Sequence, residues 1–412
     1  MQVTSTAANE PEVRDIHDAW KNYHDTVQRA YETIKSTTRY KENPDHRAQA
    51  LYSVAEAQAM AYNFVIAPRQ NNPRIYGPTS WNSYLYTLGQ NGQDALYGMM
   101  ALNGKQTYRI TGRQGDLKLI LVQVHNQVLG YPGAKDIGNY DFNDFEYNDD
   151  GTFELLLSAS EQKGNWIKLD GGSDFNFILI RRWFGDTGDD MGEMNIEMLE
   201  PLENYSEFSE AALARRLDMA SYFITFLVED WTIGLADLYS KNAGGKNKFW
   251  YVRGAELVDL LGSASPSYGL GVFELARDEA LIIESDVPDS AYWSYQLGDI
   301  WSKSLDFTHK QTDINTDHAA IDSDGKFRAV VAQRDPGVAN WLDPVGRTEF
   351  IVVFRNYREI GEERISAPTI KRVKFSEIRD HLPTDTTEIS TEERANKLEK
   401  RRRGYAKLLD AF

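Results

Sequence analysis

The sequence predicts an α+β protein, mainly β, with two antiparallel β-sandwich or jelly-roll-like domains and inserted and flanking helices. Three observations support this class. Short β-favouring apolar stretches alternate with Gly, Asn and Pro, one β-unit is used twice, and helical periodicity is confined to separate regions. The chain has 412 residues, of which 41% are hydrophobic, enough for about two or three domains with full cores.

Five segments are predicted along the chain, each from a local pattern. An N-terminal helical arm is expected over residues 1–70, where apolar side chains recur at spacings of three and four. A first β-sandwich domain follows over 71–205, a helical insertion over 206–265 and a second β-sandwich domain over 266–360. Residues 361–412 are expected to form a linker and a basic C-terminal helix.

The helices are predicted from apolar periodicity and from start signals. A second helix of the arm is expected after Pro44, and the insertion repeats the helical spacing over 213–231. A capping box of Ser390 and Glu393 predicts the start of the C-terminal helix. The apolar face expected for the first helix consists of Ile16, Trp20, Tyr23, Val27, Tyr31 and Ile34.

The C-terminal helix contains the run Arg401-Arg402-Arg403. We interpret it as a solvated face or a salt-bridging arm in an acidic protein, rather than as a patch for nucleic acid or an anionic membrane. The apolar side of this helix is expected to dock on the chain's own body or on a neighbouring subunit. Because the N-terminal arm also has an apolar face, a homo-oligomer through the terminal helices stays open.

The repeated β-unit is the most specific feature of the sequence. Each Asp-Gly pair predicts a tight turn into a strand, because Gly accepts positive φ. The tryptophans are interpreted mainly as core residues, with a substrate platform as the alternative. Each closing arginine must reach solvent, a carboxylate or a bound anion, and pairing with an acid is favoured. The first copy reads Asp150-Gly151-Thr152-Phe153, Asn165-Trp166 and an apolar strand ending in Arg181; the second reads Asp324-Gly325-Lys326-Phe327, Asn340-Trp341 and an apolar strand ending in Arg355.

Charge and composition exclude several classes of function. The 62 acidic and 45 basic side chains give a net charge of −17, which makes nucleic acid an unlikely partner. The absence of Cys excludes disulfides, a thiol nucleophile and thiolate metal centres. No apolar stretch approaches the roughly 18 residues of a membrane span, and no signal peptide is visible at the N-terminus. We therefore expect a cytoplasmic protein, unless a leader has been trimmed.

Cofactor motifs are absent from the sequence. Residues 98–105 have one residue too many between the glycines for a phosphate-binding loop, and they lack the Ser or Thr that holds magnesium. Gly269 and Gly271 lack the third glycine of a dinucleotide site. Both acidic turns lack the carboxylate that a calcium loop needs at position 12, and the seven His show no metal-ligand spacing. We expect no metal and no nucleotide cofactor.

Three stretches of the chain resemble a large bacterial family. Its C-terminal module is the domain of unknown function number twelve-fourteen, usually with an N-terminal partner domain. The stretches are Asn91 to Asp116, Asn139 to Phe184 and Tyr268 to Tyr357, with the specific signature Asp335-Pro336-Gly337…Asn340-Trp341-Leu342-Asp343. The resemblance implies β-sandwich domains with helical additions and implies no reaction. Where the family usually has Ser-Leu-Asn, this chain has Asp313-Ile314-Asn315, so the position carries an added carboxylate without an assigned role.

The best-matching stretches supply candidate residues for a site without a metal. A His or Asp in an aromatic cavity can act as general acid or base, Tyr can donate a hydrogen bond, and Arg can stabilise developing negative charge. Each candidate also has a purely structural interpretation, such as a turn cap, a core residue or an ion pair. The predicted catalytic residues are His318, Asp94, Tyr292 and Asp299; the predicted substrate-binding residues are Tyr97, Trp293, Asn315, Arg355, Trp341 and Arg181.

Two functional hypotheses follow. The first is a metal- and nucleotide-independent enzyme that acts on a small, largely apolar molecule by acid–base chemistry, as a lyase, dehydratase, isomerase or hydrolase. The second is a non-catalytic module that binds a carbohydrate or another small ligand, with exposed rings stacking on sugars. A shallow groove of aromatic residues favours the second, whereas a closed cavity with a few convergent polar groups favours the first.

Overall fold

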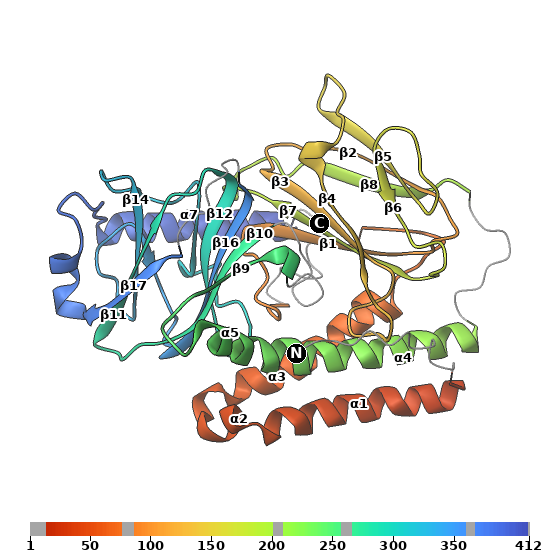
Figure 1. Cartoon of the computed structure of the whole chain (residues 1–412), viewed down its shortest axis with the longest axis horizontal. Helices are drawn as coiled ribbons and strands as arrows, with labels where there is room; N and C mark the ends of the chain where they lie inside the picture. The colour runs from red at the N-terminus through yellow and green to blue at the C-terminus, as the bar shows by residue number, and fades with distance from the viewer. Residues whose placement is uncertain (1–13, 76–85, 201–208, 257–265, 360–366, 411–412) are drawn as a thin grey trace. The chain divides into compact units, whose positions relative to one another are not determined.

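The computed structural model describes residues 14–75, 86–200, 209–256, 266–359 and 367–410, and it divides into two compact units (Figure 1). Unit 1 combines residues of Met1–Tyr86, Leu96–Arg182 and Asp190–Thr232. Unit 2 combines residues of Thr87–Ala95, Trp183–Asp189 and Ile233–Phe412. Each unit is therefore assembled from segments that are distant in the sequence.

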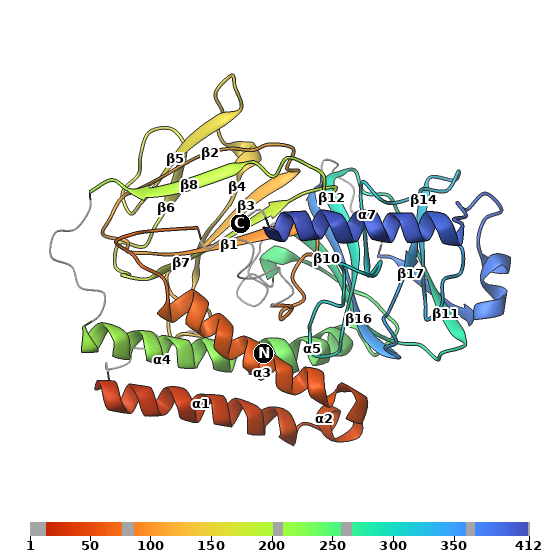
Figure 2. The same ribbon diagram turned by 180° about the vertical axis from the view of Figure 1, so that it is seen from behind.

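Unit 1 contains a layer of helices. The helices are α1 (Ile16–Ser36), α2 (Thr38–Glu42), α3 (Arg47–Ala61) and α4 (Glu210–Phe226), and α1, α3 and α4 pack against one another (Figures 1 and 2). The N-cap of α1 is Asp15, whose carboxylate accepts hydrogen bonds from two free backbone N–H groups. A turn of 3-10 helix over Pro44–His46 precedes α3.

The buried face of α1 differs from the predicted one at Trp20. This side chain is 55% exposed, whereas Ala19 and Ala30 are buried with Tyr23 and Ile34. Small residues at a contact let two helices approach closely. The periodicity therefore located the helix correctly but placed its buried stripe one residue away from the observed one.

Each unit contains two open sheets, and the strand order is the same in both. In unit 1 the orders are β1-β7-β3-β4 and β6-β5-β2-β8; in unit 2 they are β10-β16-β12-β13, with β9 added beside β10, and β15-β14-β11-β17. This confirms the predicted class of two β-sandwich-like domains with additional helices. The strands of unit 1 are β1 (Ala95–Leu102), β2 (Tyr108–Arg113), β3 (Leu119–His125), β4 (Asp136–Asp141), β5 (Thr152–Ser158), β6 (Trp166–Lys168), β7 (Asn176–Trp183) and β8 (Glu193–Met198).

Unit 2 follows the same plan with longer central strands. Strands β10 and β16 pair over nine residues in antiparallel register, from Pro266 opposite Tyr357 to Glu274 opposite Glu349. The strands are β9 (Trp250–Arg253), β10 (Pro266–Glu274), β11 (Glu279–Asp286), β12 (Ser290–Gly298), β13 (Asp313–Asn315), β14 (Lys326–Ala332), β15 (Trp341–Leu342), β16 (Glu349–Glu359) and β17 (Thr369–Lys374). Strand β17 lies within the stretch expected to be a linker.

The Asn-Trp pair makes the same backbone contacts in both units. The side-chain amide of Asn165 donates to the carbonyls of Glu146 and Glu154, and its oxygen accepts from the N–H of Glu146. Asn340 does the same with Ala320 and Arg328. Both indole N–H groups donate to a carbonyl of the preceding strand. The repeated motif therefore joins the short parallel strand, β6 or β15, to its neighbour.

Unit 2 also contains α5 (Leu235–Ala243) and the C-terminal helix α7 (Thr391–Asp410), which runs along one side of the unit (Figure 2). The predicted capping box is present, because Ser390 N–H donates to Glu393 and Glu393 N–H donates to the Ser390 hydroxyl. Gly404 lies inside α7, where a Cβ would meet the Thr187 hydroxyl at 1.8 Å. This glycine lets α7 approach the 183–189 segment.

Candidate functional site

A cavity of about 110 Å³ lies beneath α7, entirely within unit 2. Four segments line it: the end of 87–95, the 183–189 segment, the region from Gln311 to His318, and α7. The polar lining residues are Asp94, Asp186, Thr187, Gln311, Asp313, His318, Lys397, Lys400, Arg401 and Tyr405; the apolar ones are Phe184, Ile314 and Leu398. The site therefore combines charged groups with an apolar wall, as small-molecule sites do.

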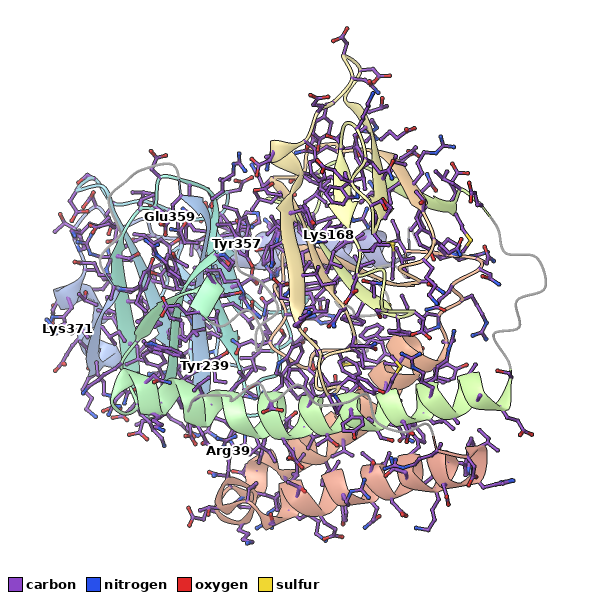
Figure 3. All side chains as sticks on the ribbon, turned by 45° about the vertical axis from the view of Figure 1, so that its right-hand side comes forward. Arg39, Lys168, Tyr239, Tyr357, Glu359 and Lys371 are labelled. Atoms are coloured by element: carbon purple, nitrogen blue, oxygen red, sulfur yellow. The ribbon has the colours of Figure 1, made fainter. Side chains whose placement is uncertain are left out.

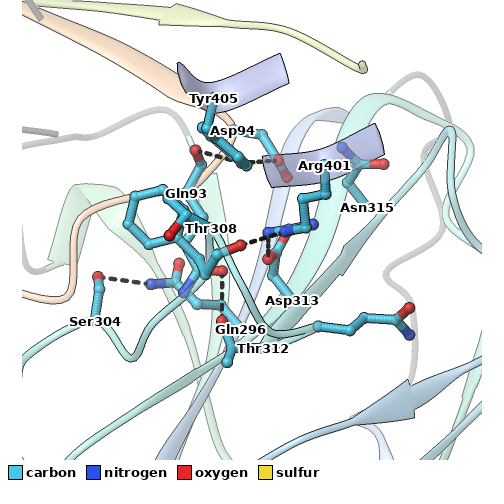
Figure 4. Close-up of polar contacts among 12 residues, drawn as sticks. Gln93, Asp94, Gln296, Ser304, Thr308, Thr312, Asp313, Asn315, Arg401 and Tyr405 are labelled. Carbon is cyan, nitrogen blue, oxygen red and sulfur yellow. Dashed lines mark hydrogen bonds and ion pairs between the residues drawn. The ribbon is translucent and has the colours of Figure 1, made fainter. Parts of the chain in front are cut away.

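Asp94 is held by two tyrosine hydroxyls. Tyr292 on β12 donates to its Oδ2 at 2.8 Å. Tyr405 on α7 donates to its Oδ1 at 3.3 Å (Figure 4). Burial raises the pKa of both tyrosines well above the usual range, and the charge of Asp94 raises it further. Both hydroxyls therefore keep their protons and remain donors to this carboxylate.

Tyr292 is itself fixed by aromatic packing. The ring of Trp183 lies 4.9 Å from that of Tyr292 and 4.7 Å from that of Tyr357, which is labelled in Figure 3. All three side chains are buried. Such packing leaves Tyr292 few alternative rotamers, so its hydroxyl is preorganised to bind Asp94.

Asp313, on β13, forms a buried ion pair with Arg401 of α7 (Figure 4). The side chain of Asp313 is 1% exposed, and its Oδ2 has no hydrogen-bond partner in the described structure. Burial raises the pKa of Asp313 to about 8; Arg401 opposes this, and the neighbouring Asp94 carboxylate reinforces it. Burial and the neighbouring Asp94 carboxylate thus favour the protonated form of Asp313, and the Arg401 guanidinium favours the ionised form.

His318 belongs to a second cluster of polar side chains in the cavity lining, together with Asp186 and Lys400. Its Nε2 lies 3.2 Å from Oδ2 of Asp186, which also accepts from Lys400 at 2.8 Å. Burial acts to raise the pKa of Asp186, but hydrogen bonds from Lys400, the Gly188 N–H and His318 outweigh it and bring the value to about 2. Asp186 therefore stays ionised and orients the imidazole ring.

Comparison with known proteins finds a family model that matches two segments. Residues 98–185 and 275–359 match the family described as protein of unknown function (DUF1214). One matched segment lies in each β-unit. The segments include Phe184, Asp313 and His318, whereas Asp94, Arg401 and Tyr405 lie outside them. The site is thus assembled from residues inside the matched segments and from residues beyond them.

Two solved structures resemble this chain. An uncharacterized protein from Burkholderia cenocepacia is 25% identical with a TM-score of 0.78, over 87% of this chain and 97% of that protein. The VPA0106 protein from Vibrio parahaemolyticus is 13% identical with a TM-score of 0.43, over 87% of this chain and 99% of that protein. No curated protein matches the chain. The first similarity agrees with the fold described above.

Within the described ranges, no group of three or more His, Cys, Asp or Glu side chains is arranged to hold a metal ion. None of the described helices is long and apolar enough to cross a membrane.

Three of the predicted catalytic residues meet at the cavity beneath α7. Asp94 and His318 line it, and Tyr292 reaches it through its bond to Asp94. Asp299 lies elsewhere: it accepts from the N–H groups of Trp301 and Lys303 and so caps a turn. Burial raises the pKa of Asp299, although Lys303 opposes the effect.

The predicted substrate-binding residues of unit 2 have structural contacts. Asn315 donates to the Gly185 carbonyl at 2.8 Å and accepts from the His318 N–H, so it positions the turn that carries His318. Trp293 packs on Phe327 in the core with a 5.0 Å ring separation. Trp341 is 8% exposed, and the guanidinium of Arg394 lies over its ring.

The two repeated arginines are bonded to glutamine rather than to an acid. Arg355 donates to the side chain of Gln296 at 2.6 Å and to the Gln90 carbonyl at 2.6 Å, within unit 2. Arg181 donates to Gln123 at 3.4 Å and lies over the ring of Tyr97, within unit 1. Neither arginine lines the cavity beneath α7.

Sequence reasoning missed Asp186, Arg401 and Tyr405 and assigned no role to Asp313. Arg401 belongs to the run interpreted as a solvated face or a salt-bridging arm. Arg402 and Arg403 pair with Glu399 on the exposed face, whereas Arg401 pairs with the buried Asp313. A usable signal was present: Arg401 and Tyr405 are four residues apart and share one helix face with the apolar residues.

Proposed function

We propose that the chain is an enzyme that transfers protons on a small, largely apolar molecule held in the cavity beneath α7. The observation that carries this proposal is the cavity lining, where the buried carboxyl of Asp313, in contact with Arg401, and the imidazole of His318 are both present. Burial raises the pKa of Asp313 to about 8. A carboxyl group with a pKa of about 8 is protonated at neutral pH and can act as a general acid. Asp313 is accordingly assigned as the proton donor.

His318 is assigned as the proton acceptor. Its Nε2 faces the ionised Asp186, so we place the hydrogen on Nε2 and the lone pair on Nδ1. This arrangement of base and orienting carboxylate is the one that general-base catalysis needs. Lys400 supports it by keeping Asp186 charged.

The two groups together suit an elimination. Nδ1 of His318 takes a proton from a substrate carbon, and the electron pair of that C–H bond forms the new double bond. The C–O bond breaks, and Asp313 gives its proton to the leaving oxygen, which departs as water. Each charge produced has a counter-ion in place: Asp186 faces the imidazolium, and Arg401 faces the new carboxylate.

An isomerisation uses the same pair at two carbon atoms, with one proton removed and one delivered. The classes supported are therefore a lyase of the dehydratase type or an isomerase. A cavity of about 110 Å³ is smaller than the ~150 Å³ that holds a benzene molecule. The substrate proposed is accordingly a compound of roughly six non-hydrogen atoms or fewer.

A non-catalytic small-ligand-binding module is the second candidate, and the apolar wall of Phe184, Ile314 and Leu398 favours it. A carbohydrate-binding surface needs exposed rings for stacking. Trp341 does not offer one, because it is largely buried beneath Arg394. Turnover separates the two candidates.

The test uses small hydroxy acids, hydroxyketones and their unsaturated counterparts incubated with the full chain in D₂O. Proton NMR detects both elimination and exchange of carbon-bound hydrogen. Asp313→Asn and His318→Gln are each expected to lower the rate by about 100-fold or more. The matched control is His309→Gln, since His309 forms a similar pair with Asp306 at 3.0 Å but does not line the cavity.

The enzyme proposal fails if no compound in the panel reacts, or if His318→Gln is as active as His309→Gln. The pH profile gives an independent readout. Because Asp313 must be protonated to act as the acid, the rate is expected to fall above a pH of about 8.

A further inference from the structure

The cavity beneath α7 adjoins an open groove on the surface of unit 2. The groove has a volume of about 490 Å³, and it is lined by α7, by the 387–389 segment and by Ala339. Lys397 and Lys400 line both the groove and the cavity. These two lysines therefore lie where a molecule would pass from the groove into the cavity.

Helix α7 presents three cations to the cavity. Lys397 precedes Lys400 by three residues and Arg401 by four, so the three side chains share one side of the helix. Two of them have carboxylate partners: Lys400 binds Asp186 at 2.8 Å, and Arg401 binds the buried Asp313. The charge of Lys397 is not balanced in this way.

Lys397 has no acidic partner in the described part of the chain. Its Nζ has no described carboxylate oxygen within 4 Å and makes no hydrogen bond to a described residue. Partial burial lowers the pKa of Lys397, and the charge of Arg394 lowers it further. Both influences act against the ammonium form, so the position lacks a negative charge that a ligand can supply.

The carboxylates around Lys397 already have partners. In the groove, Glu388 binds Arg379 at 2.6 Å, and Glu393 accepts from the N–H of Ser390 at 2.8 Å. In the cavity, the carboxylates have the tyrosine, histidine, lysine and arginine partners described above. An anion that enters through the groove therefore meets a cation that no described carboxylate neutralises.

We propose that Lys397 binds the carboxylate of a small anionic substrate, a β-hydroxy acid, at the mouth of the cavity. This assignment rests on the function proposed for the cavity and names the class of its substrate. Lys397 lies about one helical turn, roughly 5 Å, from Arg401, which binds the proposed acid Asp313. A carboxylate held at Lys397 can therefore extend its next two carbons toward the proposed acid and base.

A cation at this position suits an elimination next to a carboxylate. His318 takes a proton from the carbon that bears the carboxylate, and the electron pair of that C–H bond forms the double bond. The hydroxyl of the next carbon leaves as water with the proton of Asp313. Negative charge spreads onto the carboxylate oxygens as the proton is removed, and the ammonium of Lys397 stabilises it there. A hydroxyketone of the same size carries no charge for Lys397 to bind, so acids are expected to be preferred.

Propionate and propionamide are the probes, because they have the same size and differ in charge. Each is titrated into the full chain at neutral pH and constant ionic strength, and saturation-transfer NMR of the methyl signal reports binding. Propionate is expected to bind saturably, and propionamide about tenfold more weakly or less tightly still, because it lacks the charge-assisted contact. Lys397→Gln is expected to remove this preference, whereas Lys397→Arg keeps the charge and the preference.

The matched control is Lys407→Gln, which removes the same charge from an exposed position of α7 that lines neither the cavity nor the groove. The comparison of the two probes on the wild-type chain needs no variant, so the test stays decisive if a variant does not fold. The proposal is overturned if propionate shows no saturable binding, if propionamide binds as tightly, or if Lys397→Gln and Lys407→Gln have the same Kd for propionate.

Turnover separates this proposal from the enzyme proposal. If propionate binds through Lys397 but no hydroxy acid reacts, the enzyme proposal fails and the anion-binding residue stands. If hydroxyketones react as fast as hydroxy acids and Lys397→Gln leaves both rates unchanged, the role of Lys397 is refuted and the enzyme proposal stands.

Discussion

The two β-units share a strand order and an Asn-Trp motif, yet the matching arginine on the central strand, Arg181 on β7 and Arg355 on β16, has a different environment in each. Arg355 is saturated by two short hydrogen bonds, whereas Arg181 has one long one. The contacts that are the same in both units are those made to backbone carbonyls. The asparagine contacts recur because the strands that carry the backbone carbonyls recur. The partners of each arginine side chain differ because a different segment of the chain packs beside it in each unit.

A second difference concerns the helix that covers unit 2. Helix α7 contributes Arg401 and Tyr405 to the polar cluster around Asp94 and Asp313. Without α7, the described part of unit 2 would leave the Asp313 carboxylate without its cation. In this chain, the polar site of unit 2 therefore depends on a helix added to the repeated sheets and not on the strands alone.

The largest expected effect is on the paired arginines. Arg355→Met leaves the Gln90 carbonyl and the Gln296 oxygen without their donor, and it should lower the free energy of unfolding by about 3 kcal/mol. Arg181→Met removes a buried cation that has one long hydrogen bond, and it should change the free energy of unfolding by about 1 kcal/mol or less. Urea unfolding of both variants measures the contrast, and equal losses would contradict it.

A smaller contrast is expected for the repeated asparagines. Asn340 is 6% exposed and Asn165 is half-buried, although each makes three hydrogen bonds to backbone. Asn340→Ala should cost about 2–3 kcal/mol and Asn165→Ala about 1–2 kcal/mol, because water can replace the lost partner at the more exposed position. Thermal unfolding of the two variants tests the order, and a larger loss in unit 1 would refute this account.

The buried carboxyl pair predicts a pH dependence. A folded-state pKa near 8 lies above the unfolded value, so protonated Asp313 stabilises the fold at low pH and this contribution is lost as the pH rises through about 8. Relative to Asp313→Asn, the stability of the wild-type chain should fall on the order of 2 kcal/mol between about pH 6 and pH 8. Denaturant titrations across this range measure it. A difference that does not change with pH would show that Asp313 is ionised throughout.

The smallest effect is expected at the contact of α7 with the 183–189 segment. Gly404→Ala should favour an isolated helix by about 1 kcal/mol, but its Cβ would meet Thr187 in the folded chain. We expect a net loss of about 1 kcal/mol that Thr187→Gly reverses in the double variant. Calorimetry of the two single variants and the double variant measures the coupling, and strictly additive effects would argue against this contact.

Local patterns predicted much of the fold. The helical periodicity located α1 and α4, the capping box located the start of α7, and the repeat indicated two β-units of the same order. The buried stripe of α1 was displaced at Trp20, because periodicity alone does not say which neighbouring helix will be contacted. Each successful prediction depended on residues within about one helix or one hairpin of each other.

The candidate site was predicted only in part. Asp94 and His318 were chosen as residue types suited to acid–base chemistry, and both line the cavity. Their separation in the sequence and the position of Arg401 gave no sign that they would meet. Sequence patterns report contacts between near neighbours, and these contacts join residues hundreds of positions apart.

The sequence by itself therefore determined the class of fold, the internal repeat and the restriction of any chemistry to oxygen and nitrogen side chains. The tertiary structure alone decided that Asp313 is buried beside Asp94 and that Arg401 pairs with Asp313. It also decided that Arg181 has one long hydrogen bond where Arg355 has two short ones. The physical reason is that burial and long-range pairing, rather than residue type, set the charge state and the hydrogen-bond partners of a polar group.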